Sequence, residues 1–418
     1  MISSGALFLI LTTASYSHAL SLGLDAQLRV GRSKPVAAAW YAGWHASEFP
    51  LSQVSWDKYT YLTYSFAFPT EDPSIISLAG SAPETLPKFV KAAHQHRVGA
   101  LVSIGGWAGS RFFSTAVASP QNRTKFVNAV TEFATKHDLD GIDFDWEYPN
   151  KEGVGCNAKS PNDTSNFLAF LKELRTTDVG QKLILTAATA ITPFADANGN
   201  PSQDMSGFAK FLDYIALMNY DIWGGWSATV GPNGPLNDSC AAPQNQQGSA
   251  VRAVKAWSAA GVPLNKLLLA VPAYGHSFTV NKTAAFTSND MKELALYPGF
   301  NASIHQKGDS WDDGGLDVCG VEQPAGGTFN FWAIIKSYLN NDGTPKSDVP
   351  YKFDDCSKAA YVYDKERELM VAFDDASSFA AKGKYIAQTG LAGFALWEAA
   401  GDYNDILLDA IREGSGMC

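Results

Sequence analysis

Three acidic residues at alternating positions are the part of this sequence best suited to chemistry. Asp143, Asp145 and Glu147 fall in the run 139–149, which reads LDGIDFDWEYP. Side chains alternate between the two faces of a strand, so the three carboxyl groups would share one face, with successive members roughly 7 Å apart. The residues between them are apolar and would share the opposite face: Ile142, Phe144 and Trp146.

Carboxyl groups brought together in a buried place cannot all ionise, because like charges repel and burial removes their hydration. At least one therefore keeps its proton near neutral pH. Glu147 is the last of the three, and a raised pKa there would suit it to protonate a leaving oxygen. We expect Asp143 to lie deeper and to share a proton or charge with Asp145. The alternative, a solvated acidic edge strand, conflicts with the apolar opposite face.

Eight apolar segments, separated by amphipathic ones, are predicted as the strands that position these residues. They are Val36–Ala42, Tyr61–Phe66, Gly99–Ile104, Gly141–Asp145, Leu183–Ala188, Tyr214–Met218, Leu267–Ala273 and Gly393–Leu396. Eight βα units in 418 residues favour an α/β fold of the (β/α)8 barrel type, with active-site residues at the C-terminal ends of the strands. A doubly wound open sheet is the alternative, but no Gly-rich phosphate-binding loop supports it.

Two Ser-Pro pairs predict helix starts between the strands. Ser119 precedes Pro120, and Ser160 precedes Pro161. Serine is a favoured N-cap, and proline is tolerated at the first helical position because its missing N–H has no helical partner there. Apolar residues at helical spacing follow each pair.

The alternation of strands and helices breaks over residues 276–365. This stretch is rich in Gly, Asp, Asn and aromatic residues and contains Cys319 and Cys356. A loop of that length should have its own structure. We therefore expect a small α+β domain, 276–365, inserted between strands seven and eight of a barrel formed by 33–275 and 366–414. Such an insertion must stand on the same face of the barrel as Glu147.

The N-terminus is typical of a secretory signal peptide, residues 1–19. Ala6–Leu11 is a short apolar run, too short to span a bilayer, and Ser17-His18-Ala19 offers a cleavage site. Secretion and an extracellular location are the expectation. Five Asn-x-Ser/Thr sequons agree with it: Asn122, Asn162, Asn237, Asn281 and Asn301.

The composition, 46% hydrophobic and 18% charged, is that of a globular protein. A net charge of −10 disfavours nucleic acid and anionic membranes as partners. The sequence has no C-x-x-C, H-x-x-H or H-E-x-x-H pattern, so we expect no metal and no cofactor. The histidines are scattered along the sequence, with His276 after the seventh strand, and most of them are expected at the surface. The protein is expected to be a monomer.

Five cysteines in an oxidising compartment predict two disulfides and one free thiol. We expect Cys156–Cys240 to join two loops of the barrel and Cys319–Cys356 to lie inside the insertion, leaving Cys418 free. Spacing alone does not determine connectivity.

The run DGIDFDWEYP at 140–149 resembles the signature of glycoside hydrolase family 18, the chitinase family. Three other strand ends resemble further motifs of that family: SIGGW at 103–107, MNYD at 218–221 and LWE at 396–398. The expected insertion also falls where the insertion domain of the family falls. Within the family, the sequence most resembles fungal-type and animal-type chitinases that carry this insertion.

The resemblance implies hydrolysis of β-1,4-linked N-acetylglucosamine polymers by a substrate-assisted, retaining mechanism, with chitin and chito-oligosaccharides as partners. Glu147 would protonate the glycosidic oxygen and later activate water. Asp145, supported by Asp143, would orient the 2-acetamido group of the substrate, and Tyr220 would donate a hydrogen bond to it.

Aromatic residues at the strand ends fit a groove for sugars, because the apolar faces of pyranose rings stack on aromatic rings. The substrate-binding residues expected are Tyr41, Phe66, Gly106, Trp107, Met218, Asp221, Tyr274 and Trp397. Trp44, Trp223 and Trp226 are candidates either for this groove or for ordinary core packing.

Two other functions stay open on the same scaffold. One is a chitin-binding lectin without catalysis, although lectins of the family typically lack the acid at the position of Glu147. The other is an endoglycosidase acting on N-glycans, against which the insertion favours a deep chitin groove. The sequence does not distinguish endo from exo cleavage.

Overall fold

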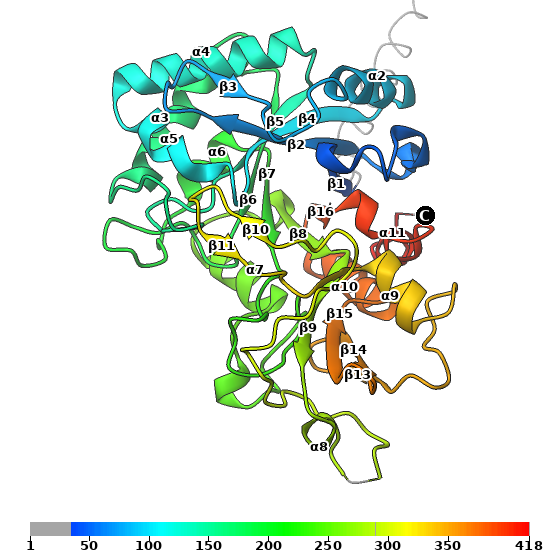
Figure 1. Cartoon of the computed structure of the whole chain (residues 1–418). Coiled ribbons are helices and arrows are strands. Elements are labelled where there is room, and N and C mark those ends of the chain that lie inside the picture. Colours follow the sequence, from blue (N-terminus) through cyan, green and yellow to red (C-terminus); the bar gives the residue numbers. More distant parts are fainter. Residues whose placement is uncertain (1–34, 289, 418) are drawn as a thin grey trace, which may run out of the picture. The chain divides into compact units, whose positions relative to one another are not determined.

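The computed structural model describes residues 35–288 and 290–417 (Figure 1). The chain divides after Pro35, and the residues from Val36 onward form one compact unit. The expected signal peptide and Cys418 lie outside the described residues. Among the described helices, none combines the length and the apolar character needed to cross a bilayer.

Within the described residues, eight parallel strands close into a barrel in the order β1-β16-β8-β7-β6-β5-β4-β2, and β2 pairs back to β1. The strands are β1 Val36–Ala42, β2 Tyr61–Pro69, β4 Gly99–Gly105, β5 Gly141–Asp145, β6 Ile184–Thr189, β7 Tyr214–Met218, β8 Leu267–Pro272 and β16 Gly393–Trp397. The short strand β3 (Ile76–Ser77) extends the end of β2 in antiparallel pairing. The predicted (β/α)8 barrel is confirmed.

Helices surround the barrel strands (Figure 1). Their bounds are α2 Leu86–His96, α3 Phe113–Val117, α4 Pro120–Lys136, α5 Asp163–Leu174, α6 Ser206–Phe211, α7 Ala250–Ala259, α10 Ala376–Thr389 and α11 Ile406–Gly414. Helix α4 begins as predicted, with the Ser119 hydroxyl accepting a hydrogen bond from the N–H of Asn122 at 3.2 Å. The prediction from Ser160-Pro161 was wrong by two residues, because α5 begins at Asp163 with Asn162 as N-cap.

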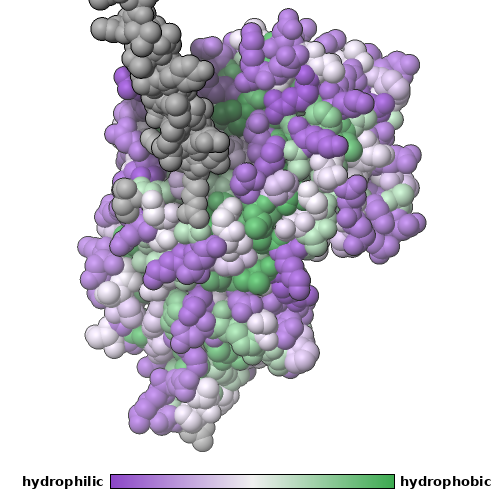
Figure 2. Space-filling model, turned by 180° about the vertical axis from the view of Figure 1, so that it is seen from behind, coloured by the Kyte–Doolittle hydropathy of each residue, from purple (hydrophilic) through white to green (hydrophobic). Residues whose placement is uncertain are grey.

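The core lies mainly between the strands and the helices. Ile142, Phe144 and Trp146 pack there with the apolar faces of α4 and α5, whereas smaller apolar residues such as Ala38 and Ala216 fill the barrel interior. Figure 2 shows one face of the molecule, where hydrophilic residues cover most of the periphery and apolar residues gather near the middle. The alternation predicted for the strand of Asp143 is therefore realised, with its apolar side facing the helices.

A second sheet interrupts the barrel between β8 and β16, and its five strands run in the order β12-β9-β15-β14-β13 within the described residues. Their bounds are β9 Tyr274–Thr279, β12 Thr328–Asn330, β13 Tyr351–Asp354, β14 Ala359–Asp364 and β15 Leu369–Phe373. Helices α8 (Lys282–Ala285) and α9 (Phe331–Tyr338) and the hairpin of β10 (Gly315–Leu316) and β11 (Glu322–Gln323) belong to the same region. This second sheet begins before residue 276 and ends after residue 365. The bounds 276–365 for an inserted domain remain a prediction.

The predicted disulfide pairing was wrong. Cys156 bonds to Cys319 and Cys240 bonds to Cys356, with Cα atoms 5.7 Å and 6.1 Å apart. Both bonds join a loop of the barrel to the insertion, instead of joining two barrel loops and stapling the insertion internally. Cys156 lies in the loop after β5 and Cys240 in the loop after β7, and both loops lie at the C-terminal ends of the barrel strands. The insertion packs against these loops, so each barrel cysteine meets a cysteine of the insertion.

Candidate active site

Strand β5 carries Asp143 and Asp145, and Glu147 follows two residues after the strand ends. Asp143 is buried and accepts hydrogen bonds from the hydroxyls of Ser103 (2.8 Å) and Thr186 (2.6 Å) and from Nε1 of Trp40 (3.1 Å). Burial raises the pKa of Asp143, and these three donors lower it in part. Asp143 is thus held by three donors, and both of its oxygens accept hydrogen bonds.

Asp145 and Glu147 lie above it, at the end of the strand. Burial raises the pKa of Asp145 well above its ordinary value, and the charges of Glu147 and Asp143 add to that effect. Burial also raises the pKa of Glu147, to about 7, and the nearby carboxylate of Asp221 contributes in the same direction. Within the described residues, Oδ1 of Asp145 is buried and accepts no hydrogen bond. Asp145 and Glu147 together therefore retain a proton near neutral pH. Oδ1 of Asp145 remains available to accept a hydrogen bond.

The main chain around Glu147 is fixed by neighbouring loops. Its N–H donates to the hydroxyl of Ser110 at 2.9 Å, and its carbonyl accepts from Nδ2 of Asn157 at 2.8 Å. At the end of β4, a Cβ on Gly105 would lie 2.1 Å from the carbonyl oxygen of Asp145. Only glycine allows the two strand ends to approach this closely, and Gly105 also has a φ of +118° that favours glycine.

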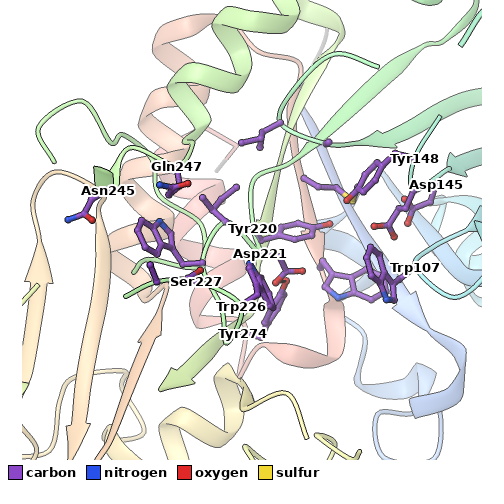
Figure 3. A pocket seen from close by; sticks show the side chains of 18 of the residues that line it. Trp107, Asp145, Tyr148, Tyr220, Asp221, Trp226, Ser227, Asn245, Gln247 and Tyr274 are labelled. Atoms are coloured by element: carbon purple, nitrogen blue, oxygen red, sulfur yellow. Dashed lines mark hydrogen bonds between the residues drawn. The ribbon is translucent and has the colours of Figure 1, made fainter. Parts of the chain in front are cut away.

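A cavity of ≈ 740 Å³ opens at the C-terminal end of the barrel, and we call it the barrel-mouth cavity. Among the predicted site residues, these line it: Phe66, Trp107, Asp145, Glu147, Met218, Tyr220, Asp221, Tyr274 and Trp397. Trp223 and Trp226 line it as well. Figure 3 shows Trp107 and Asp145 at one end, Asn245 and Gln247 at the other, and Tyr220 and Asp221 between them.

Three predicted residues do not line this cavity. Tyr41 is buried on the outer side of β1, where its ring packs near Tyr64 and Phe89 and its hydroxyl donates to the carbonyl of Phe49, so its assignment to the substrate groove was wrong. The parity of β1 explains this position, because Trp40 faces the barrel interior and Tyr41 must then face the helices. Asp143 lies beneath the cavity.

Gly106 is the third, and it acts on the cavity through a neighbour. Its N–H donates to the carbonyl of Asp145 at 2.8 Å, and a Cβ at this position would meet the ring of Phe66 at 2.8 Å. Its absent side chain therefore leaves room for Phe66, which does line the cavity.

Asp221 is the centre of a polar cluster on the wall opposite Glu147. Its Oδ1 accepts from the hydroxyl of Tyr274 at 2.7 Å and lies 2.7 Å from Nε2 of His276. His276 is buried, whereas the other histidines of the described residues are exposed or partly exposed. Both Tyr274 and His276 come from β9, the first strand of the second sheet, so the insertion contributes directly to this wall.

An amide-rich wall at the far end of the cavity was missed by sequence reasoning. Gln244, Asn245 and Gln247 come from the loop between β7 and α7, which has no periodic pattern. Only topology could have pointed to this loop, because segments that follow barrel strands lie on the site face.

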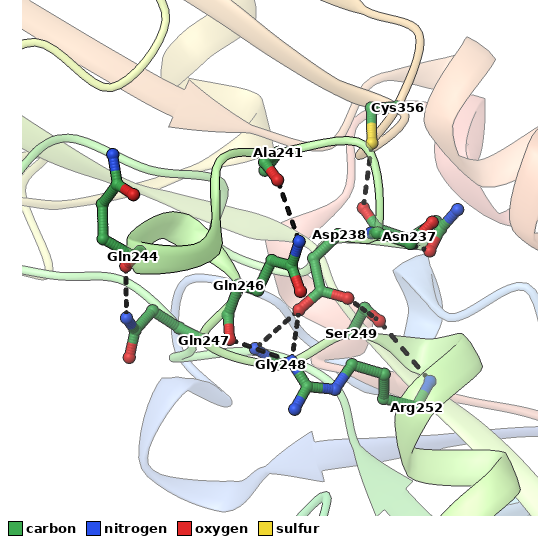
Figure 4. A network of polar contacts seen from close by, with 11 residues as sticks. Asn237, Asp238, Ala241, Gln244, Gln246, Gln247, Gly248, Ser249, Arg252 and Cys356 are labelled. Carbon is green, nitrogen blue, oxygen red and sulfur yellow. Dashed lines mark hydrogen bonds and ion pairs between the residues drawn. The ribbon is translucent and has the colours of Figure 1, made fainter.

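Figure 4 shows how that loop is held. The buried carboxylate of Asp238 accepts from the N–H of Gly248 (3.1 Å), the hydroxyl of Ser249 (2.9 Å) and the guanidinium of Arg252 (3.0 Å). The Cys240–Cys356 disulfide ties the same loop to the insertion.

These features place a buried carboxyl group, Asp145, and a half-buried one, Glu147, in a cavity at the barrel mouth that aromatic side chains also line. A family model for glycosyl hydrolases family 18 matches residues 36–402. The chain belongs to glycosyl hydrolase family 18. The matched range contains all eight barrel strands and the second sheet, and it ends before α11.

Two curated relatives are more than 50% identical to this chain over the aligned residues. A chitinase-like effector of Moniliophthora roreri is 52% identical over 413 residues, covering 98% of each chain. A chitinase-like effector of Moniliophthora perniciosa is 54% identical over 388 residues, covering 92% of this chain and 88% of the relative. Among solved structures, a chitinase from Rhizomucor miehei superposes with a TM-score of 0.82 at 33% identity, covering 91% of this chain and all of that one.

Proposed function

We propose that this protein is a secreted chitinase that hydrolyses β-1,4-linked N-acetylglucosamine polymers, with Glu147 as the proton donor. The observation that carries the proposal is that Asp145 and Glu147 line one cavity at the barrel mouth together with Trp397. Burial raises the pKa of Glu147 to about 7. A carboxyl group with that pKa is protonated at mildly acidic pH and suited to general-acid catalysis. The family membership and the similarity to the Rhizomucor miehei chitinase support the reaction type.

The reaction proceeds in two displacements. The carbonyl oxygen of the substrate's own 2-acetamido group attacks the anomeric carbon as Glu147 gives its proton to the departing glycosidic oxygen, so the C–O bond breaks and a cyclic oxazolinium-like intermediate forms. The ionised Glu147 then removes a proton from water, which opens the ring and restores the β configuration. No protein nucleophile is required.

The other residues orient the acetamido group. Oδ1 of Asp145 has no hydrogen-bond partner among the described residues, so it is free to accept from the acetamido N–H and to stabilise the developing positive charge. The hydroxyl of Tyr220, on the cavity wall, would donate to the acetamido oxygen. Asp143 lies deeper in the barrel, where its carboxylate accepts hydrogen bonds from three donors. It would keep the surroundings of Asp145 polar.

Extracellular action is part of the proposal. The signal peptide expected over 1–19 and the two disulfides within the described residues support it, because such bonds persist in oxidising compartments.

A second candidate function is binding of chitin oligomers without hydrolysis. Two relatives above 50% identity are named chitinase-like effectors, which is the observation that favours it. Against it stands the presence of Asp143, Asp145, Glu147 and Tyr220, of which the last three line the barrel-mouth cavity.

Product analysis separates these possibilities. The protein is incubated with chitin oligomers and, separately, with an N-glycosylated protein, and the products are identified by mass spectrometry. Shorter N-acetylglucosamine oligomers and an intact glycoprotein are expected. Oligomers that are bound but never shortened would establish the binding function instead, and release of N-glycans would establish an endoglycosidase.

A further inference from the structure

Asn233 joins the barrel to the second sheet through one buried side chain. Its Oδ1 accepts a hydrogen bond from the backbone N–H of Asp221 at 2.8 Å, and its Nδ2 donates to the backbone carbonyl of Tyr274 at 3.0 Å. Asp221 follows β7 of the barrel, whereas Tyr274 is the first residue of β9. Asn233 is 1% exposed and does not line the barrel-mouth cavity, so a ligand in that cavity would not touch it.

We propose that Asn233 is a positioning residue, which fixes the main chain of Asp221 against β9 so that the Asp221 carboxylate meets Tyr274 and His276. The inference rests on the proposed function for its effect on hydrolysis, whereas the contacts themselves need no substrate. Asn233 acts through the carboxylate of Asp221 and would have no effect on the proton of Glu147 where that carboxylate is absent.

The main chain of Asp221 has an uncommon conformation that needs such support. Its φ is +53°, in the left-handed region that residues other than glycine seldom adopt. A conformation of this kind persists where the surrounding contacts hold it. The next residue, Ile222, donates its N–H to the backbone carbonyl of Asn233 at 3.1 Å. Two consecutive N–H groups, those of Asp221 and Ile222, therefore end on Asn233.

The segment that carries Asn233 is closely packed. Residues 231–235 read Gly-Pro-Asn-Gly-Pro, and all five are buried. The ring of Pro232 fixes the backbone just before Asn233. Just after it, a Cβ on Gly234 would lie 2.6 Å from the carbonyl oxygen of Asn219, so the chain approaches the end of β7 too closely for any side chain there. Asn233 is thus an ordered support whose own position is fixed on both sides.

The bridge requires an amide side chain. A carboxamide offers an acceptor and a donor together, whereas a carboxylate only accepts and an ammonium group only donates. Both partners of Asn233 are backbone groups, and a buried backbone group that loses its partner destabilises the fold. The residue type at this position therefore matches the two groups that face it, one donor from the barrel and one acceptor from β9.

The placement of the Asp221 carboxylate matters because it acts on the proton of Glu147. Figure 3 shows Asp221 in the cavity wall with Tyr274 and Tyr220. The titratable groups around it are Tyr274 and His276 of β9, Tyr220 beside it in the chain, Asp145 of β5, and Glu147 and Tyr148 after β5. The charge of Asp221 helps to raise the pKa of Glu147 and that of Tyr148. A carboxylate that is no longer held should lose part of this effect.

Carbon NMR of the glutamate carboxyl groups measures the consequence directly. The Glu147 signal is identified by its absence from Glu147→Gln, and its pKa is then followed in the wild type, Asn233→Ala, Asp221→Asn and the double variant. Asn233→Ala should lower the pKa of Glu147 by about 0.5 unit. The same substitution should cause no further shift in the Asp221→Asn background, because Asn233 acts through that carboxylate.

Ser357→Ala is the matched control for loss of a buried polar group at the same junction. Ser357 is 1% exposed, its carbonyl accepts from the N–H of Leu236, and its hydroxyl donates to Asp354, away from the cavity lining. This variant should leave the pKa of Glu147 unchanged. Asn233→Ser is measured as well, since it removes less volume than Asn233→Ala and remains informative if the alanine variant does not fold.

The alkaline limb of kcat/KM should move to lower pH in the Asn233 variants, in step with the NMR value. An unchanged pKa of Glu147 in a folded Asn233 variant would overturn the inference, as would an equal shift with and without the Asp221 carboxylate. A wild type that hydrolyses no chitin oligomer would instead count against the proposed function, and the NMR comparison would still decide the role of Asn233.

Discussion

His276 and Tyr274 reach the same oxygen of Asp221, each at 2.7 Å. The two residues belong to β9, a strand of the second sheet, whereas Asp221 follows barrel strand β7. This contact connects the insertion to the carboxylate that helps to keep a proton on Glu147. The insertion thus takes part in setting the electrostatics of the site as well as in walling the cavity.

Replacing Asp221 by Asn should shift the pH dependence of hydrolysis. The carboxylate of Asp221 raises the pKa of Glu147, which is about 7, so its removal lowers that pKa. Glu147 must be protonated to act as the acid, and activity is lost as pH rises through its pKa. The alkaline limb of kcat/KM should therefore move to lower pH, by about 0.5–1 unit.

The control for this variant is Asp57→Asn, since that side chain is 89% exposed and remote from the cavity. A limb that stays in place for Asp221→Asn, or moves to higher pH, would show that Asp221 does not act on the proton of Glu147.

Asp145→Asn should slow hydrolysis by about 10²-fold, because the acetamido group loses the anion that stabilises its developing charge. The stereochemical course should not change, since the attacking oxygen belongs to the substrate. Proton NMR of the first products from the wild type and the variant should show the β-anomer before mutarotation. An α-anomer seen first would contradict the double-displacement mechanism.

Glu398 should make the folded protein less stable as pH rises. It is buried, accepts a hydrogen bond from the N–H of Ala42 at 3.0 Å, and has its pKa raised by burial from 4.5 to about 8. A carboxyl with a raised folded-state pKa contributes stability that is complete below about pH 4.5 and is lost as pH rises through about 8.

Glu398→Gln keeps an acceptor for Ala42 but cannot ionise. The variant should match the wild type at pH 4.5 and exceed its free energy of unfolding at pH 8 by up to a few kcal/mol. Denaturant unfolding at the two pH values measures this difference. A variant that is equally destabilised at both values would show that Glu398 contributes through packing alone.

The cysteine connectivity is directly testable by peptide mapping without reduction, which should recover Cys156 joined to Cys319 and Cys240 joined to Cys356. Replacing the second pair by serine should lower the free energy of unfolding by about 2–4 kcal/mol. It should also weaken oligomer binding, because the loop that carries Gln244, Asn245 and Gln247 loses its tie to the insertion. Replacing the first pair is the matched control for stability, since Cys156 and Cys319 belong to neither the amide loop nor the cavity lining.

The barrel was predictable because its strands are short, apolar and separated by amphipathic helices. Buried parallel strands give continuous apolar runs, and all eight segments proved to be strands within a few residues of their expected ends. The start of α5 was less predictable. The carboxylate of Asp163 accepts from the N–H groups of Ser160 and Asn150, and these contacts organise the turn before the helix. Such contacts depend on the folded loop and leave no local pattern.

The residues on β5 were predictable because three acids on one strand face are physically unusual. The position of Tyr41 could have been found from the alternation of β1, in which Trp40 faces inward. The amide wall and the disulfides were not predictable, because both depend on how the insertion meets the loops of the barrel. The burial of His276 was not predictable for the same reason, since its partner, Asp221, lies 55 positions earlier in the chain.

The most direct test of the account is the comparison of the wild type with Glu147→Gln, in which hydrolysis and binding of one chitin oligomer are measured on the same preparations. The amide keeps the shape of the side chain but cannot donate the proton. Hydrolysis should fall on the order of 10²–10⁴-fold while the dissociation constant changes little. Near-wild-type hydrolysis by Glu147→Gln, or a wild type that binds the oligomer and never cleaves it, would contradict the role assigned to Glu147.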